Sequence, residues 1–538
     1  MPLKSTIFTN AVIFTADRRS WAEAMVVVGE RIAYVGDLGS ARRVAGNAEE
    51  VDMEGALILP GFVDGHAHVC QTGQALRQLD LTTATDLPDI QQRLRAWAES
   101  QADSPRLRLF AWQHAAIPGG RPTRQMLDEV VPDKPVYAQS FDFHSIWLNS
   151  AALAEVGIDA STVDPPGGTV YRDAVTGLPT GYIDETAVQL YLWPALDGFE
   201  TDRERDDHVA HAMDAYRKHG VTSTTDMGLT DNDLAAMVRA EKAGTLTTRV
   251  VGHWVVAHRP DMDANLGEVR RAAELAAQHR SPRLRVTGVK FAVDGTVDGC
   301  TAALGVPYSN GSMPGPIWTL DALAPVVTAA DAAGLQVAMH AIGDEAIRVA
   351  IGSLEHAARE NGPRPRRHRI EHLEVVGADE INRLAALGIT ASMQPVHADP
   401  AIQENWRAML GDERVQRGYP WPEMTEAGAS LAFGTDSPTA PMPPLRNVFI
   451  AATRRSAFDP SLPANIPRYA LPLADAIRHA TADAAWSCRA DGDVGRLRAG
   501  LYADFIVLDR NIFERSIDEL LSAQVRATYV GGERVYAS

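Results

Sequence analysis

Residues 61–68 read GFVDGHAH, and the interpretation of the whole chain starts from this stretch. It follows an apolar run, Ala56–Pro60, and it ends in two histidines that are two positions apart. Alternate residues of a strand face the same side, so His66 and His68 would point together. Imidazole is a good ligand for Zn, Fe, Ni or Mn. An isolated His-x-His pair is more often two polar residues on one strand face, so its meaning depends on the rest of the chain.

Downstream of this stretch, strand-like segments alternate with helix-like segments. This alternation predicts a parallel sheet with crossover helices. Eight parallel strands that close on themselves make a (β/α)8 barrel, whose reactive groups lie at the C-terminal ends of the strands. We therefore expect an α/β fold built on a TIM-like barrel. Its eight candidate strands are residues 62–68, 221–226, 249–256, 285–293, 335–340, 368–373, 388–393 and 430–436.

Two further parts are expected beside the barrel. The gap between the first and second candidate strands is too long for one crossover helix, which predicts an inserted subdomain at about residues 70–204. Short β-prone runs occur near both chain ends, and neither end is long enough to hold a good core alone. We therefore expect residues 1–60 and 487–538 to form one composite β-sandwich beside a barrel domain of residues 61–486.

Composition limits the classes of function. The chain has 538 residues, of which 45% are hydrophobic and 22% are charged, as in an ordinary globular protein. Its net charge of −18 argues against non-specific binding to nucleic acid or to a membrane surface. The three cysteines form no Cys-x-x-Cys pair, and the N-terminus lacks the apolar core of a signal peptide. We expect a cytoplasmic protein with a small-molecule substrate, and a homodimer is the default assembly.

Four further polar residues stand in predicted strands. Lys290 lies inside an apolar strand, where a lysine is costly to bury unless it is paired or used chemically. His340, His372 and Asp436 each end a candidate strand. Each of these residues alone could be a satisfied polar group of the core. Together with the histidine pair they mark strands one, four, five, six and eight, which is where a barrel metal site needs them.

Several motifs resemble those of one family. Together they resemble the amidohydrolase superfamily, and more narrowly its amidohydrolase-3, YtcJ-like branch, over nearly the whole chain. Two residues depart from the family pattern: Phe143 replaces the usual glycine in the motif of residues 142–153, and Leu501 replaces the usual lysine in the motif of residues 495–504. The motifs are GFVDGHAH (61–68), DFHSIWLNSAAL (142–153), KFAVDG (290–295), HAIGD (340–344), RIEH (369–372), SMQP (392–395), GTDSP (434–438) and GRLRAGLYAD (495–504).

The resemblance implies a divalent metal centre. It implies that His66 and His68 bind a buried metal together with Asp436, and that His340 and His372 bind a second one. It also implies that Lys290, when carboxylated by CO2, bridges the two ions, since a carbamate turns a neutral amine into an anionic oxygen ligand. The expected cofactor is one or two ions, with Zn as the first choice and Mn, Fe or Ni as alternatives.

The expected reaction is metal-dependent hydrolysis of a C–N bond, such as that of an amide, an N-acyl amine or an N-formyl amine. Asp436 would accept the proton of the attacking water and return it to the leaving nitrogen. The alternatives are hydrolysis of an ester, a carbamate or a cyclic imide, and deamination of a heterocycle. Deaminases of the superfamily usually carry His-x-x-Glu after the fifth strand, whereas Gly343 stands three residues after His340 here. A non-catalytic, metal-binding regulatory barrel is also an alternative, although none of the implied ligands is missing.

Substrate contacts are expected from the inserted subdomain and from the loops at the barrel mouth. His144 is the best candidate for a contact with the substrate or with an oxyanion, and the alternative is a histidine that holds a loop. Phe143, Trp112 and Trp318 are candidates for an aromatic wall, and the alternative for them is core packing.

Overall fold

Eight parallel strands form the centre of the molecule, in a computed structural model that describes residues 4–538 apart from the side chain of Glu404. Neighbouring strands are hydrogen-bonded in chain order, and each overlaps a segment predicted above. The prediction of an α/β, TIM-like barrel is therefore confirmed. The barrel strands are β8 (Phe62–Ala67), β15 (Val221–Leu229), β16 (Arg249–Val255), β17 (Leu284–Ala292), β18 (Gln336–Ala341), β19 (Arg369–His372), β20 (Thr390–Met393) and β21 (Ser430–Phe433).

The barrel closes where β8 meets the end of β21. The amide of Asp436 donates to the carbonyl oxygen of His66 at 2.7 Å, and the amide of His68 donates to that of Ser437 at 2.9 Å. A Cβ atom at Gly434 would lie 2.3 Å from the backbone nitrogen of His66. This junction therefore needs a glycine, and it brings Asp436 directly beside the two histidines of the first strand.

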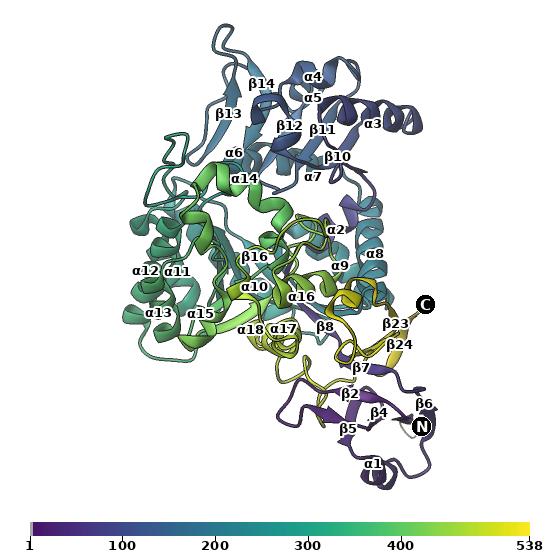
Figure 1. The fold of residues 1–538 in the computed structure, drawn as a ribbon. Coiled ribbons are helices and arrows are strands. Elements are labelled where there is room, and N and C mark those ends of the chain that lie inside the picture. Colours follow the sequence, from purple (N-terminus) through teal and green to yellow (C-terminus); the bar gives the residue numbers. More distant parts are fainter. Residues whose placement is uncertain (1–3) are drawn as a thin grey trace.

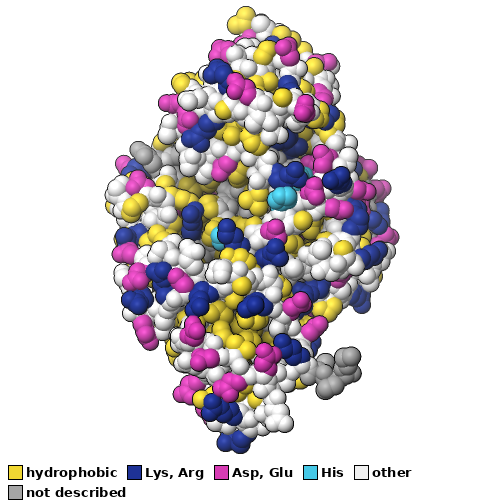
Figure 2. Space-filling model, turned by 90° about the vertical axis from the view of Figure 1, so that its right-hand side faces the viewer, with side chains coloured by type: hydrophobic (Ala, Val, Ile, Leu, Met, Phe, Trp, Pro, Cys, Tyr) yellow, Lys and Arg dark blue, Asp and Glu magenta, His cyan; other side chains and the backbone are white. Residues whose placement is uncertain are grey.

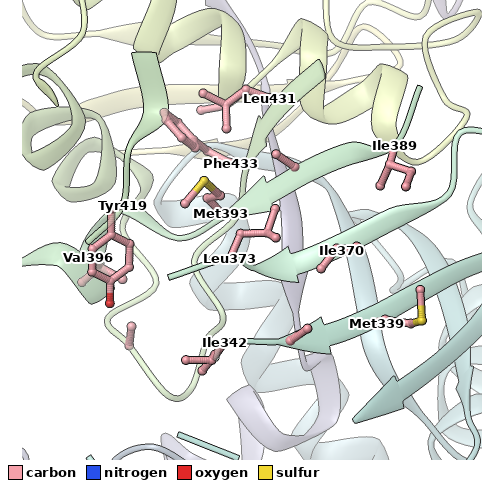
Figure 3. Close-up of a cluster of buried hydrophobic side chains, with 14 of the residues drawn as sticks. Met339, Ile342, Ile370, Leu373, Ile389, Met393, Val396, Tyr419, Leu431 and Phe433 are labelled. Carbon is pink, nitrogen blue, oxygen red and sulfur yellow. The ribbon is translucent and has the colours of Figure 1, made fainter. Parts of the chain in front are cut away.

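Helices cover the outside of the barrel (Figure 1). In Figure 3 the strands of the second half of the barrel run side by side, and Ile342, Val396 and Tyr419 lie beyond their C-terminal ends. The covering helices include α8 (Asp202–Lys218), α9 (Asp231–Ala243), α10 (Met262–Gln278), α11 (Leu320–Ala332), α12 (Asp344–Asn361), α13 (Ala378–Leu387), α16 (Pro444–Thr453), α17 (Leu473–His479) and α18 (Ala482–Ser487).

The two chain ends meet in one six-stranded sheet. Strand β7 (Leu57–Pro60), just before the barrel, pairs antiparallel with β22 (Phe505–Leu508) near the C-terminus. A second sheet has the order β5-β4-β1-β6 and comes from the N-terminal part alone. Phe8, Met25, Ile58 and Phe505 belong to one buried cluster that draws on both sheets. The remaining strands are β1 (Ser5–Thr9), β2 (Val12–Phe14), β3 (Trp21–Ala22), β4 (Ala24–Val28), β5 (Arg31–Gly36), β6 (Glu49–Asp52), β23 (Val525–Val530) and β24 (Glu533–Ala537).

The insertion between β8 and β15 contains its own six-stranded sheet, of order β13-β14-β12-β11-β10-β9. Figure 1 shows this sheet at the top of the molecule, with α3 (Leu87–Ser100), α4 (Arg124–Asp128) and α5 (Ser150–Glu155) beside it. The loop between β11 and β12 carries residues 141–144. There Thr296, which follows β17, donates to Asp142 at 2.8 Å, so this loop is held against the barrel mouth. The strands are β9 (Leu79–Asp80), β10 (Leu107–Trp112), β11 (Val136–Ser140), β12 (Ser145–Leu148), β13 (Gly168–Arg172) and β14 (Pro179–Asp184).

The surface carries charges of both signs. Figure 2 shows one face of the molecule, where Lys and Arg side chains are interspersed with Asp and Glu, and where hydrophobic side chains gather near the middle. No helix within residues 4–538 is both long and apolar enough to cross a membrane.

Candidate metal centre

Ends of the first, sixth and eighth barrel strands bring four residues together: His66, His68, His372 and Asp436. Asp436 Oδ1 lies 3.3 Å from His66 Nε2 and 3.2 Å from His68 Nε2. Asp436 Oδ2 lies 3.9 Å from His372 Nδ1. His66, His372 and Asp436 are all buried, and each offers a ligand atom within 4.8 Å of the others. Side chains that are far apart in the sequence therefore converge on one point at the barrel mouth.

The chemistry of this cluster fits a divalent ion. Asp436 Oδ1 is buried and makes no hydrogen bond to any residue that the structure describes. A buried carboxylate oxygen without a partner is costly, and a cation beside it would remove that cost. Imidazole nitrogens together with a carboxylate oxygen form a ligand set that suits Zn and other late first-row metals.

A buried ion pair orients His66. The Nδ1–H of His66 donates to Glu371 Oε2 at 2.8 Å, which turns Nε2 toward Asp436. Arg369 donates to both carboxylate oxygens of Glu371, at 2.6 and 2.9 Å. Burial, with the nearby Lys290 ammonium, lowers the pKa of His66 to about 4. His66 is therefore neutral near pH 7, which is the form that binds a metal.

Residues of β15 hold His68 in place, at the start of α2 (Val69–Ala75). Asp226, in β15, accepts the amide of Val69 at 2.8 Å and that of Gly228 at 2.9 Å. The imidazole of His68 lies against Gly228, where a Cβ atom would be 2.6 Å from His68 Nδ1. The ring position therefore depends on a bare backbone at residue 228.

The structure places His340 and Lys290 next to this cluster. His340 is buried, and its ring centroid is 4.5 Å from that of His372. Its Nε2 lies 3.1 Å from the carbonyl oxygen of Gly295, which accepts a hydrogen bond from it. Lys290 Nζ lies 3.4 Å from His66 Nε2, and burial lowers the pKa of Lys290 below its usual value. All six predicted ligands thus lie at one end of the barrel.

The sequence interpretation missed His397 and its partner Glu374. His397 lies in the 3₁₀ helix η4 (Pro395–Ala398), after β20, and its Nδ1 donates to Glu374 Oε1 at 2.9 Å. Its Nε2 lies 3.6 Å from Asp436 Oδ2. With His372 these two residues form a second group of close ligand atoms. The only signal in the sequence was that His397 closely follows the SMQP motif and Glu374 the RIEH motif.

A cavity of about 640 Å³ opens beside the cluster, between the barrel mouth and the insertion. His66, His68, Lys290, His340, His372 and Asp436 reach its wall. Apolar side chains from the insertion and from the barrel loops, such as Leu196, Met227 and Trp254, line other parts of it. Pockets for small organic molecules have volumes of roughly 300–1,000 Å³, so this one can hold a substrate of that size.

Two predicted contact residues, Phe143 and His144, line this cavity. The Nδ1–H of His144 donates to Glu185 Oε2 at 2.8 Å. Burial alone would lower the pKa of His144, but Glu185, with Asp142 and Asp294, raises it to about 9. His144 is therefore an imidazolium near pH 7. Phe143 has a φ of 66°, a conformation that favours glycine, and its ring is stacked 6.5 Å from that of His68.

The expected roles of Trp112 and Trp318 in substrate binding are corrected by the structure. Trp112 is fully buried in the core of the insertion, and its indole N–H donates to the carbonyl oxygen of Ala138 at 2.9 Å. Trp318 is fully buried against Phe291 and His258. Neither side chain reaches the wall of the cavity. Aromatic side chains bury a large apolar area in cores, and that role explains both positions.

The sequence profile of the amidohydrolase family matches residues 49–536, which is nearly the whole chain. The protein belongs to the amidohydrolase family. It is 28% identical, over 91% of its length and 90% of the relative, to the putative amidohydrolase YtcJ of Bacillus subtilis. It is 27% identical, over 98% of each chain, to the N-substituted formamide deformylase of Arthrobacter pascens. These relatives support the YtcJ-like branch inferred from the motifs.

A solved structure of a metal-dependent hydrolase has the same fold as this protein. An uncharacterised metal-dependent hydrolase from Pyrococcus horikoshii OT3 aligns with a TM-score of 0.76 and 25% sequence identity. The alignment covers 96% of this chain and 99% of the other. Together with the family match and the cluster at the barrel mouth, it makes this amidohydrolase a metal-dependent hydrolase.

One prediction for this amidohydrolase concerns Lys290. Replacing it with alanine should reduce both metal content and activity, because its side chain lies within 3.4 Å of His66 and reaches the same cavity. Metal analysis of the purified variant, by inductively coupled plasma mass spectrometry, measures the first effect. A Lys290→Ala protein with the metal content of the parent would show that Lys290 has no bridging role.

A second prediction concerns Gly228. Replacing it with alanine should displace the ring of His68 and weaken metal binding by roughly tenfold or more, as is usual when the support of a ligand is lost. Competition with a metal-binding dye measures the affinity. Gly198→Ala is the matched control, since a Cβ atom there meets nothing within 4 Å. Equal affinities of the two variants would contradict the role of Gly228.

Proposed function

We propose that this amidohydrolase cleaves the C–N bond of amides, in particular of N-acyl or N-formyl amines. The observation that carries the proposal is the position of Asp436, whose carboxylate lies among the imidazoles of His66, His68 and His372 at the wall of a cavity of about 640 Å³. The similarity to an N-substituted formamide deformylase over 98% of each chain supports the choice of amide substrates.

His66, His68 and Asp436 would hold one divalent ion and His340 and His372 a second one, with a carboxylated Lys290 as a ligand shared by both. We propose Zn as the ion, with Mn, Fe or Ni as alternatives, because nitrogen ligands dominate the set. When bound, such an ion supplies Lewis-acid activation of water and of the substrate carbonyl group.

In this proposal, the side chains of the protein move the protons and position the substrate. Asp436 accepts the proton of the attacking water and returns it to the leaving nitrogen. Burial alone would raise the pKa of Asp436, but the cluster of His66, His372 and His68 around it lowers that pKa well below its usual value. Asp436 is therefore ionised near pH 7, which is the form that can accept a proton. The imidazolium of His144 donates a hydrogen bond to the carbonyl oxygen, where negative charge develops.

A chromogenic panel tests this function. The protein is stripped of metal with a chelator and reloaded with Zn or Mn, and it is assayed with N-(4-nitrophenyl)formamide, N-(4-nitrophenyl)acetamide and 4-nitrophenyl acetate. We expect metal-dependent release of 4-nitroaniline from at least one amide. Cleavage of the ester alone would favour an esterase instead. Absence of turnover with every metal and substrate would favour the non-catalytic barrel.

A further inference from the structure

A second, smaller cavity of about 50 Å³ adjoins the metal centre. We call it the small chamber. It shares six lining residues with the large cavity: Asp142, His144, His340, His372, Asp436 and Thr439. Three of the six predicted ligands, His340, His372 and Asp436, therefore lie where the two cavities meet. A substrate whose reacting carbon is at the metal centre has one side facing the small chamber and the other side facing the large cavity.

Bulky side chains bound the small chamber beyond the metal ligands. Ile402 and Trp406 come from α14 (Pro400–Leu410), and Tyr419 comes from the segment before α15 (Trp421–Glu426). Trp406 and Tyr419 are both 1% exposed, and their rings are stacked 5.1 Å apart. The indole N–H of Trp406 donates to Asp298 at 3.3 Å. Figure 3 shows Tyr419 beyond the strand ends, beside Val396. Because Trp406 and Tyr419 are stacked and buried, these side chains cannot move away from the chamber easily.

The polar residues of the chamber are also held in place. Glu374 accepts the hydrogen bond from His397 at 2.9 Å, and Asp142 accepts one from Thr296 at 2.8 Å. These side chains are fixed by their partners. The rest of the chamber wall includes the apolar residues Phe141, Ile342 and Ile402. Their side chains, with the fixed polar ones, limit the size of the group that can enter the chamber.

The two volumes differ more than tenfold, about 50 against about 640 Å³. One water needs roughly 10–15 Å³ of cavity by this kind of measure, so the chamber holds about three to five waters. That space suits a group of about two to four non-hydrogen atoms, such as a formyl or acetyl group. A longer chain would have to displace the packed wall, and overpacking of this kind is unfavourable.

We propose that the small chamber is the acyl subsite of this enzyme, and that it limits the substrates to short-chain N-acyl amines, formyl and acetyl above all. The inference rests on the proposed function, in which the substrate is an N-acyl amine. When the amine part is large, it fits only the cavity of about 640 Å³, and the acyl group then occupies the small chamber. Ile402 is the residue that determines the length limit, because it is an aliphatic wall residue on the partly exposed face of α14.

The first experiment varies the acyl chain on one amine. The metal-loaded enzyme is assayed with the formyl, acetyl, propionyl, butyryl and benzoyl amides of 4-nitroaniline. We expect kcat/KM to fall by about tenfold or more for each methylene beyond acetyl, which is the usual discrimination of a tight pocket. Comparable kcat/KM from formyl to benzoyl would overturn the inference.

The second experiment changes the wall. Ile402→Ala should allow longer acyl chains, so that kcat/KM for the propionyl and butyryl amides rises relative to kcat/KM for the formyl amide. Ile402→Phe should have the opposite effect and lower kcat/KM for the acetyl amide more than kcat/KM for the formyl amide. Met409→Ala is the matched control, because Met409 lies on the same helix but outside the chamber wall. Metal content is measured for all three variants, so that a loss of the metal is not taken for a change in specificity.

The outcomes separate the inference from the proposed function. A chain-length preference that is unchanged in both Ile402 variants would overturn the inference and leave amide hydrolysis in place. Fast cleavage of primary amides of bulky acids, with slow cleavage of N-formyl amines, would place the small side of the substrate at nitrogen and would also overturn it. If no amide in either series is cleaved, both the proposed function and the acyl subsite are wrong.

Discussion

Replacing Asp436 with asparagine is expected to lower kcat by at least ~100-fold while leaving the fold and the bound metal largely intact. Asparagine has nearly the same shape and keeps one oxygen that can face His66 and His68. It cannot accept the proton of a water molecule at neutral pH. The loss should therefore fall on kcat more than on KM, because the missing step is proton transfer rather than binding.

Steady-state kinetics on a 4-nitroanilide, together with metal analysis of the same sample, measure this effect. Asp509→Asn is the control, since Asp509 directly follows β22 of the terminal sheet, outside the lining of the cavities, and forms an ion pair with Arg510. It should retain the parent kcat. Retained activity in the Asp436→Asn enzyme, with a normal metal content, would remove Asp436 from the proton-transfer role.

Replacing Arg369 with alanine is expected to destabilise the barrel by about 3–5 kcal/mol, which is the usual cost of leaving a buried charge without its partner. Arg369 and Glu371 are both fully buried, and Arg369 Nε lies 2.6 Å from Glu371 Oε1. Arg369 also donates to the carbonyl oxygen of Gly65 in β8 and to Ser392 in β20, so that it links the first and seventh strands across the barrel. Its removal leaves Glu371 charged and only partly compensated by His66.

Urea denaturation of the metal-free proteins measures this loss without a contribution from metal binding. Arg383→Ala is the matched control, because Arg383 pairs with Glu355 at 2.9 Å on the surface, where an ion pair contributes about 0–1 kcal/mol. The double variant Arg369→Met, Glu371→Leu should be more stable than Arg369→Ala, since it leaves no unpaired charge. A free energy of unfolding for Arg369→Ala within about 1 kcal/mol of the parent would contradict this account.

Much of the fold and of the metal centre could be predicted because both depend on short-range patterns. Short strand-like segments alternate with helix-like segments along the chain, and this pattern indicates that His66, His340, His372 and Asp436 lie at or just beyond strand ends. Parallel strands of a barrel end at the same rim, so their terminal residues converge whatever the intervening loops do. The long gap after the first strand likewise required an insertion.

The aromatic residues were a different case. Phe143 does line the cavity, whereas Trp112 and Trp318 lie in cores, and of the three only Phe143 belongs to one of the quoted motifs. A large aromatic side chain is equally suited to a core and to a pocket wall, so only the packing of distant segments decides between the two.

By itself, the sequence determined a barrel with its predicted ligands at or near the strand ends, because strand periodicity and order decide which residues share a rim. The amidohydrolase family followed from the resemblance of its motifs. The tertiary structure alone decided how those ligands are held: Glu371 and Arg369 behind His66, Gly228 against His68, and His397 with Glu374 beside Asp436. It alone also divided the space around the metal centre into a large cavity and a small chamber. These features depend on contacts between segments that are up to hundreds of residues apart, as with His66 and Glu371, and no local pattern encodes the distance between such segments.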